Sequence, residues 1–258
     1  MNYTLTNVFF SPGGSTATVS SHIASALSTQ IQTIDLLRNQ VTSPLFFGEK
    51  DLLVISIPVF AGRIPMICTE MLSMLKGQKT PAIISVVYGN RAYDDALLEL
   101  FELVTQNGFL VAGAAAFVAR HSIFPDVAKD RPNEMDLKQI ESFAKSSFLT
   151  IQNSTFANLP IPGNNPYRKP GNIPLHPTGN SKCIRCGICS KLCPVDAICI
   201  HTPKKTDTEK CISCTACIYH CPQNARAFRG VKYLVASKGF QKKYSTSLQP
   251  DFFLEHSL

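Results

Sequence analysis

The chain has 258 residues, of which 45% are apolar and 17% are charged, so it can bury a substantial core and is not a disordered polypeptide. This length favours one full domain plus a smaller one. The net charge of +7 is uneven, because residues 1–159 contain 11 Lys and Arg against 13 Asp and Glu, whereas residues 160–258 contain 14 against 5. The basic character belongs to the C-terminal part.

Membrane insertion and export are not expected. The longest apolar run, Phe109–Ala119, is far shorter than the roughly 20 residues that span a bilayer. No Lys or Arg precedes Arg38, so the basic region of a signal peptide is missing, and a cytoplasmic protein is predicted. Ten cysteines in such a protein favour metal or cluster binding over disulfides.

The first 150 residues alternate apolar runs with helical patterns, which predicts a parallel α/β sheet. The predicted strands are Leu5–Phe10, Gln32–Leu36, Leu52–Ile57, Pro81–Val87 and Gly108–Phe117. The predicted helices are Ala17–Leu27, Pro65–Leu75, Asp94–Gln106 and Asp136–Ile151. Five strands with intervening helices indicate a doubly wound sheet, whose ligands bind beyond the carboxyl ends of the strands.

Three loops are expected at that edge. The first contains Ser11, Gly13, Gly14, Ser15 and Thr16 before a helix, where free N–H groups and the helix dipole favour a phosphate. It has no Lys and is therefore not a triphosphate-binding loop. The other two bring aromatic rings and flexible backbone to one crevice, as a flat heterocycle would need. Their candidate binding residues are Pro58, Val59, Phe60 and Gly62 in the second loop, and Tyr88, Gly89, Asn90 and Tyr93 in the third.

A cysteine pattern occurs twice, 28 residues apart, as C-x2-C-x2-C-x3-C-P. This spacing matches bacterial ferredoxins, in which three cysteines bind one cubane and the fourth reaches the other. We therefore expect two [4Fe-4S] clusters. Cluster one takes Cys183, Cys186, Cys189 and Cys221, and cluster two takes Cys211, Cys214, Cys217 and Cys193. Two structural zinc sites are the alternative. Cys68 and Cys199 lie outside the pattern and are expected to be small buried residues.

Four segments follow from these patterns: a domain over 1–152, a linker over 153–180, a cluster-binding domain over 181–230 and a tail over 231–258. Six prolines in the linker favour an extended, semi-rigid connection that lies along the first domain. For the tail, packing on the body and docking of a partner both stay open.

The first domain resembles a flavodoxin, whose phosphate loop is matched by Ser11, Gly14, Ser15 and Thr16, with Gly13 in place of one hydroxyl. The whole chain resembles the flavodoxin–ferredoxin fusion proteins of anaerobes called ferrodoxins, through segments such as P-V-F-A-G-R-I-P and Y-G-N-R-A-Y-D-D-A-L. The resemblance implies a flavodoxin-like doubly wound five-stranded parallel sheet, a small α+β ferredoxin-like domain with two [4Fe-4S] clusters, and bound FMN.

Some roles stay open within this resemblance. The chain has no Trp, so Phe60 and Tyr88 are the candidates for stacking on a flavin, with Tyr93 behind them. The arginines of the second and third loops, at positions 63 and 91, either hydrogen-bond flavin carbonyls or pair with surface acids. His121 is expected to be a solvated loop residue, with a place in the crevice as the alternative.

The predicted function is electron transfer between two [4Fe-4S] clusters and FMN, with a redox protein as partner and no catalytic residue assigned. One alternative is a flavin enzyme that reduces a small substrate, with His121 or Tyr93 as the acid. Another is a ferredoxin whose first domain has lost FMN and only docks a partner. Nucleic-acid binding is not expected, because no basic run is interleaved with aromatic residues.

Overall fold

The computed structural model describes residues 3–156, 158–171 and 173–255. Its main element is a sheet with the strand order β10-β7-β6-β4-β1-β2. The five parallel strands are β1 (Thr4–Phe9), β2 (Ile31–Asp35), β4 (Asp51–Pro58), β6 (Thr80–Tyr88) and β7 (Phe109–Val118). Counted among themselves in chain order they run 2-1-3-4-5, which is the flavodoxin-like doubly wound order. The predicted fold class is therefore confirmed.

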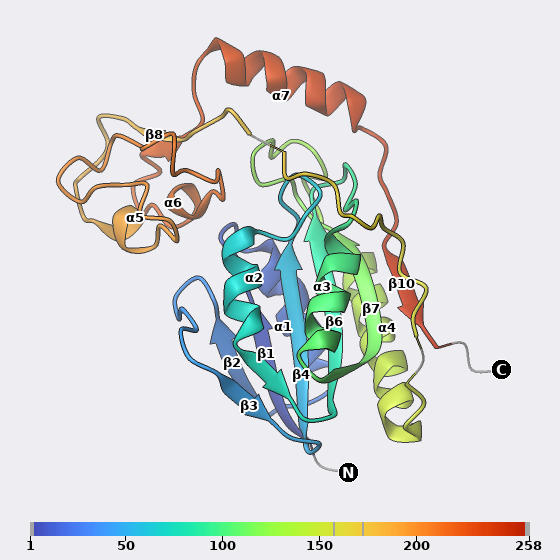
Figure 1. The fold of residues 1–258 in the computed structure, drawn as a ribbon. Helices are drawn as coiled ribbons and strands as arrows, with labels where there is room; N and C mark the ends of the chain where they lie inside the picture. The colour runs from blue at the N-terminus through green and yellow to red at the C-terminus, as the bar shows by residue number, and fades with distance from the viewer. Residues whose placement is uncertain (1–2, 157, 172, 256–258) are drawn as a thin grey trace.

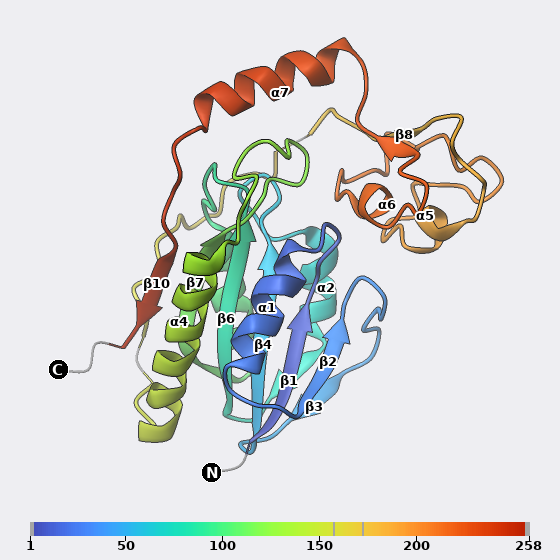
Figure 2. The same cartoon turned by 180° about the vertical axis from the view of Figure 1, so that it is seen from behind.

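Helices cover both faces of this sheet (Figures 1 and 2). The helices are α1 (Ser15–Ser25), α2 (Met66–Ser73), α3 (Ala96–Gln106) and α4 (Glu134–Asn153). Val19 of α1 and Phe143 of α4 share one buried cluster, whereas Met71 of α2 and Leu100 of α3 share the other. Strands covered on both faces read as nearly continuous apolar runs, which explains why the sequence predicted them well.

The predicted boundaries differ from the observed ones by a few residues at most. The predicted helix over 65–75 ends at Ser73, because Leu75 begins a short strand, β5 (Leu75–Gly77). This strand pairs in parallel with β3 (Leu45–Phe47) beside the main sheet. Neither short strand was predicted, since three residues are too few to show a period.

The C-terminal residues add a sixth, antiparallel strand, β10 (Asp251–Leu254), to the free edge of β7. Phe252 lies opposite Ala115, and its ring stacks on Phe143 with centroids 5.5 Å apart. Covering the edge satisfies backbone groups that would otherwise face solvent or another chain. The tail is thus packed on the body at this strand.

Helix α7 (Val231–Lys243) precedes β10 and crosses above the carboxyl ends of the strands (Figure 1). Its Tyr233 donates a hydrogen bond of 2.9 Å to the Ile123 carbonyl, and Phe240 packs on Phe124 with ring centroids 4.7 Å apart. Phe228 of the cysteine-rich region belongs to the same small cluster. A second core therefore connects α7, the loop after β7 and the cysteine-rich region.

The proline-rich segment runs along the first domain in an extended form, as expected. Leu159 is buried in the main core, and the backbone N–H groups of Asn164 and Arg168 donate to Asp95 at 2.9 and 2.7 Å. These contacts hold the pKa of Asp95 below its usual value, even though burial acts in the opposite direction. The connection is therefore anchored along its path.

The cysteine-rich region is small and contains little regular structure. Strands β8 (Thr178–Gly179) and β9 (Arg226–Ala227) pair antiparallel, and α5 (Ile188–Lys191) and α6 (Ala216–Tyr219) follow equivalent positions of the two repeats. This region lies beyond the carboxyl ends of β1 and β4 (Figures 1 and 2). None of the helices in the described ranges is long and apolar enough to cross a membrane.

Candidate functional site

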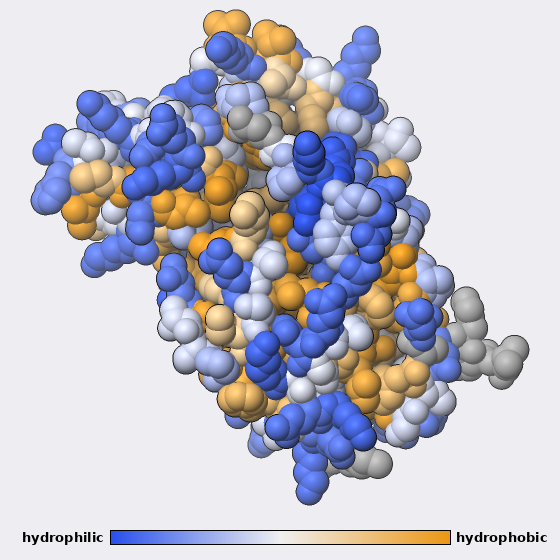
Figure 3. All heavy atoms as spheres, in the orientation of Figure 1, coloured by the Kyte–Doolittle hydropathy of each residue, from blue (hydrophilic) through white to orange (hydrophobic). Residues whose placement is uncertain are grey.

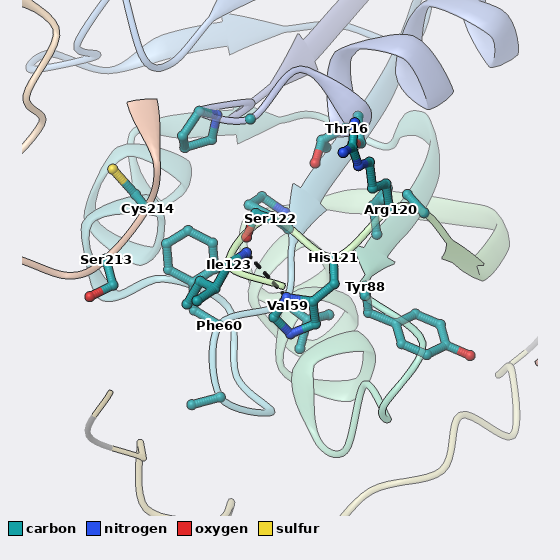
Figure 4. Close-up of a pocket in the computed structure, with 18 of the residues that line it drawn as sticks. Thr16, Val59, Phe60, Tyr88, Arg120, His121, Ser122, Ile123, Ser213 and Cys214 are labelled. Atoms are coloured by element: carbon teal, nitrogen blue, oxygen red, sulfur yellow. Dashed lines mark hydrogen bonds between the residues drawn. The ribbon is translucent and has the colours of Figure 1, made fainter. Parts of the chain in front are cut away.

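The predicted loops meet the cysteine-rich region around one cavity of about 110 Å³ (Figure 4). Among the predicted flavin residues, the cavity is lined by Gly13, Ser15, Thr16, Pro58, Val59, Phe60, Tyr88 and Gly89. The cysteine-rich region contributes Ile212, Ser213 and Cys214, and the linker contributes Ile173. The site is thus formed by both parts of the chain, which the sequence did not predict.

The first loop has the backbone of a phosphate site. Gly14 has a φ of 88°, in the left-handed region that favours glycine, and α1 begins directly after it at Ser15. The Ser11 hydroxyl accepts a hydrogen bond from the Ala17 N–H at 2.8 Å and so satisfies one of the free N–H groups in the first turn of α1. Ser15 and Thr16 are the hydroxyl residues of this loop that line the cavity.

Tyr219 of the second repeat covers this loop. A Cβ added to Gly14 would lie 2.6 Å from the Tyr219 hydroxyl oxygen, and one added to Gly13 would lie 3.3 Å from Oγ1 of Thr215. The two glycines therefore leave the space into which the cysteine-rich region packs. This close approach gives the glycines a second role besides the turn.

The second loop carries Phe60 into the cavity and turns tightly at Ala61 and Gly62, whose φ values are 51° and 88°. Arg63 next to this turn donates two hydrogen bonds of 2.7 Å to Glu99, and hydrogen bonding to Glu99 raises the Arg63 pKa. In the third loop, Arg91 pairs with Asp94. Both arginines therefore pair with acids.

The aromatic residues of the third loop make other contacts than those predicted for them. The Tyr88 ring is 5% exposed and points away from Phe60 and Cys214 (Figure 4), with its edge toward Tyr93 at a centroid distance of 5.5 Å. Burial raises the pKa of Tyr88 to about 12. The Tyr93 hydroxyl donates to Asp251 at 2.8 Å, and burial together with that bond raises its pKa. These two rings therefore contact each other and the tail, and Phe60 is the predicted stacking residue whose ring lies at the cavity.

Asn90 also contacts the tail. Its side-chain amide donates to the carbonyls of Tyr244 and Thr246 at 3.0 and 2.8 Å and accepts from the Leu248 N–H at 3.0 Å. The tail thus takes up all three polar contacts that the structure shows for this side chain. Asn90 supports the third loop and does not line the cavity.

His121 is not a solvated loop residue, so that expectation is wrong. It lines the cavity, and its ring lies 5.1 Å from Phe124 and 4.7 Å from Phe240. Its Nδ1 accepts hydrogen bonds of 3.1 Å from the N–H groups of Ile123 and Phe124. Burial, with a smaller effect of the Arg91 charge, lowers the His121 pKa to about 4. The ring is therefore neutral at pH 7, and its proton is on Nε2.

The two cysteine repeats have the same local structure. Arg185 and Ser213 occupy equivalent positions with φ values of 56° and 55°. The fourth cysteine of each repeat accepts the same hydrogen bond, from Ala197 N–H to Cys193 Sγ at 3.2 Å and from Ala225 N–H to Cys221 Sγ at 3.3 Å. Hydrogen bonds from amide groups to cysteine sulfurs tune the reduction potential of iron–sulfur clusters.

Several of the repeat thiols are buried, and burial changes their acidity. Burial raises the pKa of the Cys214 thiol to about 12 and also raises the pKa values of the Cys211 and Cys217 thiols. Thiolates at such positions need nearby positive charge, which a bound metal ion or cluster would supply.

Arg226 provides further positive charge near the cysteines, and the sequence analysis did not predict this role. It is 2% exposed, and its charge acts to lower the pKa values of Cys189, Cys217 and Cys221. Its guanidinium donates to the carbonyls of Pro177, at 2.8 Å, and Pro203, whereas Nε has no hydrogen-bond partner among the described residues. A buried cation among cysteines assigned to both clusters fits two anionic groups.

The two remaining cysteines differ from each other. Cys68 is fully buried in α2, and burial raises its pKa, with a smaller effect of Cys214. Cys199 is exposed, and hydrogen bonds from the backbone of His201 and Thr202 lower its pKa. The expectation of a buried residue is therefore confirmed for Cys68 and wrong for Cys199, which is exposed although its neighbour Ile198 packs in a small core with Cys189 and Cys217.

The residues around the cavity fit a flavin. Val59, Phe60, Ile123 and Ile212 offer apolar walls, the start of α1 offers N–H groups, and His121 offers one polar atom. Two adjoining hollows, of about 350 and 260 Å³, share Ala61 and Ile173 with the cavity. The space around the cavity therefore continues past Ala61 and Ile173.

Comparisons with known proteins agree with this organisation. Residues 178–222 match a family described as a 4Fe-4S dicluster domain, and this match contains all eight repeat cysteines. The search of curated proteins gives no match. The match supports an iron–sulfur domain of the 4Fe-4S kind in the region 178–222.

Several solved structures resemble the chain. The rubredoxin oxygen:oxidoreductase of Desulfovibrio gigas has a TM-score of 0.45 and 13% identity, and the similarity covers 61% of this chain and 38% of that one. A flavodoxin of Streptococcus pneumoniae has a TM-score of 0.43 and 17% identity over 57% and 98% of the two chains. A short-chain flavodoxin associated with a bacterial microcompartment has a TM-score of 0.45 and 13% identity over 58% and 99%.

The chain thus spans about two fifths of the length of the oxidoreductase. The fold assignment itself rests on the strand order, which is flavodoxin-like. Together with the dicluster match, this order shows that the chain has the domain arrangement of a flavodoxin–ferredoxin fusion, as its sequence predicted.

Proposed function

We propose that the chain is an electron-transfer protein that carries two [4Fe-4S] clusters and FMN, and that it passes low-potential electrons between them. The proposal is based on a flavodoxin-like fold combined with a match to a 4Fe-4S dicluster domain. The proposed ligands of cluster one are Cys183, Cys186, Cys189 and Cys221, and those of cluster two are Cys211, Cys214, Cys217 and Cys193. The proposed functional units are residues 1–152 for FMN and 181–230 for the clusters.

One observation carries the proposal. Cys214, a proposed ligand of cluster two, lines the same cavity as Phe60 and Ser15. A cluster attached to Cys214 is therefore a direct neighbour of any flavin in this cavity. FMN, when bound, takes up one or two electrons, whereas each cubane passes one at a time. The combination suits exchange between one-electron and two-electron partners.

The chain's own residues have separate tasks in this proposal. The N–H groups at the start of α1, with the hydroxyls of Ser15 and Thr16, hold the phosphate. Phe60 and Val59 contact the ring, and the neutral His121 offers its Nε2 proton as a hydrogen-bond donor. Ile212 and Cys214 line the cavity on the side of the cysteine-rich region.

The test is a cofactor analysis of the protein purified and reconstituted without oxygen. We expect about eight iron and eight sulfide per chain, and about one FMN retained after gel filtration. Stoichiometric zinc without visible absorption would contradict the clusters. Protein with both clusters that retains no FMN would instead favour a ferredoxin whose first domain only docks a partner.

A further inference from the structure

The loop of the first repeat that corresponds to the cavity-lining loop is exposed. Because the repeats are 28 residues apart, residues 184–187 correspond to residues 212–215. Gly187 and Thr215 have φ values of 79° and 71°, so the two loops share a backbone conformation that glycine usually adopts. The same shape is therefore presented twice on the cysteine-rich domain.

The surroundings of the two loops are opposite. Thr215 is 4% exposed and its loop packs on the flavodoxin-like domain, whereas Ile184 is 62% exposed and Cys186 is also exposed. Ile200, which is 47% exposed, lies against the first loop, since a Cβ on Gly187 would be 3.3 Å from its Cδ1. An exposed cluster ligand is thus flanked by two exposed apolar side chains.

The chain segment that carries these two apolar side chains is basic. Between residues 181 and 205 the sequence has one acidic residue, Asp196, and five basic ones, all exposed. The basic residues are Lys182, Arg185, Lys191, Lys204 and Lys205. A cubane with four thiolates carries about −2, so the segment stays positive when cluster one is present. Figure 3 shows hydrophilic side chains with hydrophobic atoms among them over this end of the molecule.

We propose that this face, defined as Lys182, Ile184, Arg185, Cys186 and Ile200, docks an external redox protein with an acidic rim around an apolar contact. The proposal rests on the proposed function. The second loop of the repeat already contacts the flavodoxin-like domain inside the chain, and the first loop offers the equivalent contact to a separate protein. Apolar centres with charged rims are typical of such interfaces.

The position of this face specifies where an electron enters the protein and which cluster receives it first. One electron passes from the reduced centre of the acidic partner to cluster one, so that the partner is oxidised and cluster one is reduced by one electron. The electron then moves through cluster two to the flavin side. No proton and no other reactant is needed for the docking step itself.

The experiment measures electron entry from an acidic protein. A purified flavodoxin of acidic isoelectric point, fully reduced, is mixed anaerobically with the reconstituted protein, and bleaching of the cluster absorption is followed by stopped flow. Lys182→Glu with Arg185→Glu reverses two charges on the proposed face. Lys238→Glu with Lys242→Glu makes the same charge change on exposed residues of α7 and is the matched control.

At low salt we expect the second-order rate constant to fall about tenfold or more in the first variant and to change by about twofold or less in the control. The dependence on salt should become weaker in the first variant only. A zwitterionic viologen of no net charge should reduce the clusters of all three proteins at one rate, which shows that the clusters are intact.

A second pair of variants tests the apolar centre of the face. Ile184→Gln with Ile200→Gln should weaken binding of the acidic flavodoxin several-fold in a way that salt does not change. Leu234→Gln with Val235→Gln on α7 removes two other exposed aliphatic side chains and should leave binding unchanged. An unchanged affinity in the first of these variants would show that the apolar pair is not part of the interface.

Three results would overturn the proposal. Equal slowing in both charge variants would mean that only net charge matters, and greater slowing in the α7 variant would place docking on that helix. Self-association of the wild type that is lost in the first variant would make a second copy of the chain the occupant. Because the readout is cluster absorption, a lack of FMN would contradict the proposed function without affecting this result.

Discussion

The two cysteine repeats have the same spacing and matching loop conformations, yet their surroundings differ. Cys214 of the second repeat lines the cavity shared with the flavodoxin-like domain, whereas Cys186 at the equivalent position is exposed. The repeated spacing specifies the cluster-binding shape, and the neighbouring residues decide what each cluster contacts. Solvent exposure also tunes cluster potentials, so the two clusters are expected to differ in potential despite equal ligands.

The largest effect is expected from replacing these equivalent cysteines one at a time. Cys214→Ala removes a ligand at the cavity, and Cys186→Ala removes the equivalent ligand at the exposed face. Each variant should lose about four of eight iron. Only Cys214→Ala should also abolish the concentration-independent phase in which the flavin is reduced after rapid mixing with a reduced viologen, because Cys214 lines the cavity proposed for the flavin.

Iron analysis and the kinetic trace check both statements. The Cys186→Ala protein is the control, since it retains the path from cluster two to FMN. Loss of the internal phase in both variants would show that the two clusters are not distinguished by their distance from the flavin.

The next effect compares two glycines with a positive φ, Gly14 in the phosphate loop and Gly187 in the first repeat. Gly14→Asp puts a side chain at a φ of 88°, within 2.6 Å of the Tyr219 hydroxyl, and adds a negative charge at the phosphate loop. FMN should be lost in gel filtration while about eight iron remain. Gly187→Ala meets only the flexible end of Ile200 at 3.3 Å, so FMN content should stay unchanged.

Equal FMN retention in wild type and Gly14→Asp would contradict the assignment of the phosphate loop. Loss of iron in Gly14→Asp would show that the packing of Tyr219 on this loop supports the cluster as well. The Gly187→Ala control separates both cases from a general effect of placing a side chain at a residue with positive φ. Thr215, at the position equivalent to Gly187, has a φ of 71° and shows that this position accepts a side chain.

The parts that the sequence predicted are those with a strong local pattern. The buried strands show continuous apolar runs, and the cluster ligands show a fixed spacing, so both could be read directly. Strand β10 could not, because four residues have too little pattern and its partner lies about 135 positions earlier in the chain. Asn90 and Tyr93 were assigned to the flavin for the same reason, since their contacts with the tail depend on that pairing.

Long-range contacts also explain the other differences. The place of Arg226 depends on folding of both repeats around it, and its signal in the sequence is a lone basic residue five positions after Cys221. The burial of His121 depends on Phe240 of α7, about 120 residues later. The cavity wall formed by Ile212 and Cys214 could not be predicted without the placement of the second domain.

A smaller effect separates the two cysteines outside the repeats. Cys199 is exposed with a lowered pKa, so iodoacetamide should modify it in the native protein, whereas the buried Cys68 should react only after unfolding. Cys68→Ala removes a buried sulfur and should lower the free energy of unfolding by about 1 kcal/mol. The double Ala variant should keep its full iron content, and loss of a cluster would overturn the ligand assignment.

The smallest expected effect is the pH dependence of the flavin side. His121 has a pKa of about 4 in the folded protein against 6.5 ordinarily, so between these values the unfolded chain binds a proton that the native protein does not. Stability is therefore lost as the pH falls, by about 1 kcal/mol from pH 7.5 to pH 5.5. His121→Asn should remove this difference in denaturant unfolding of the holoprotein. His201→Asn, an exposed change in the cysteine-rich region, should leave the pH dependence due to His121 in place. An equal slope in the wild type and His121→Asn would show that His121 does not titrate as a buried neutral ring.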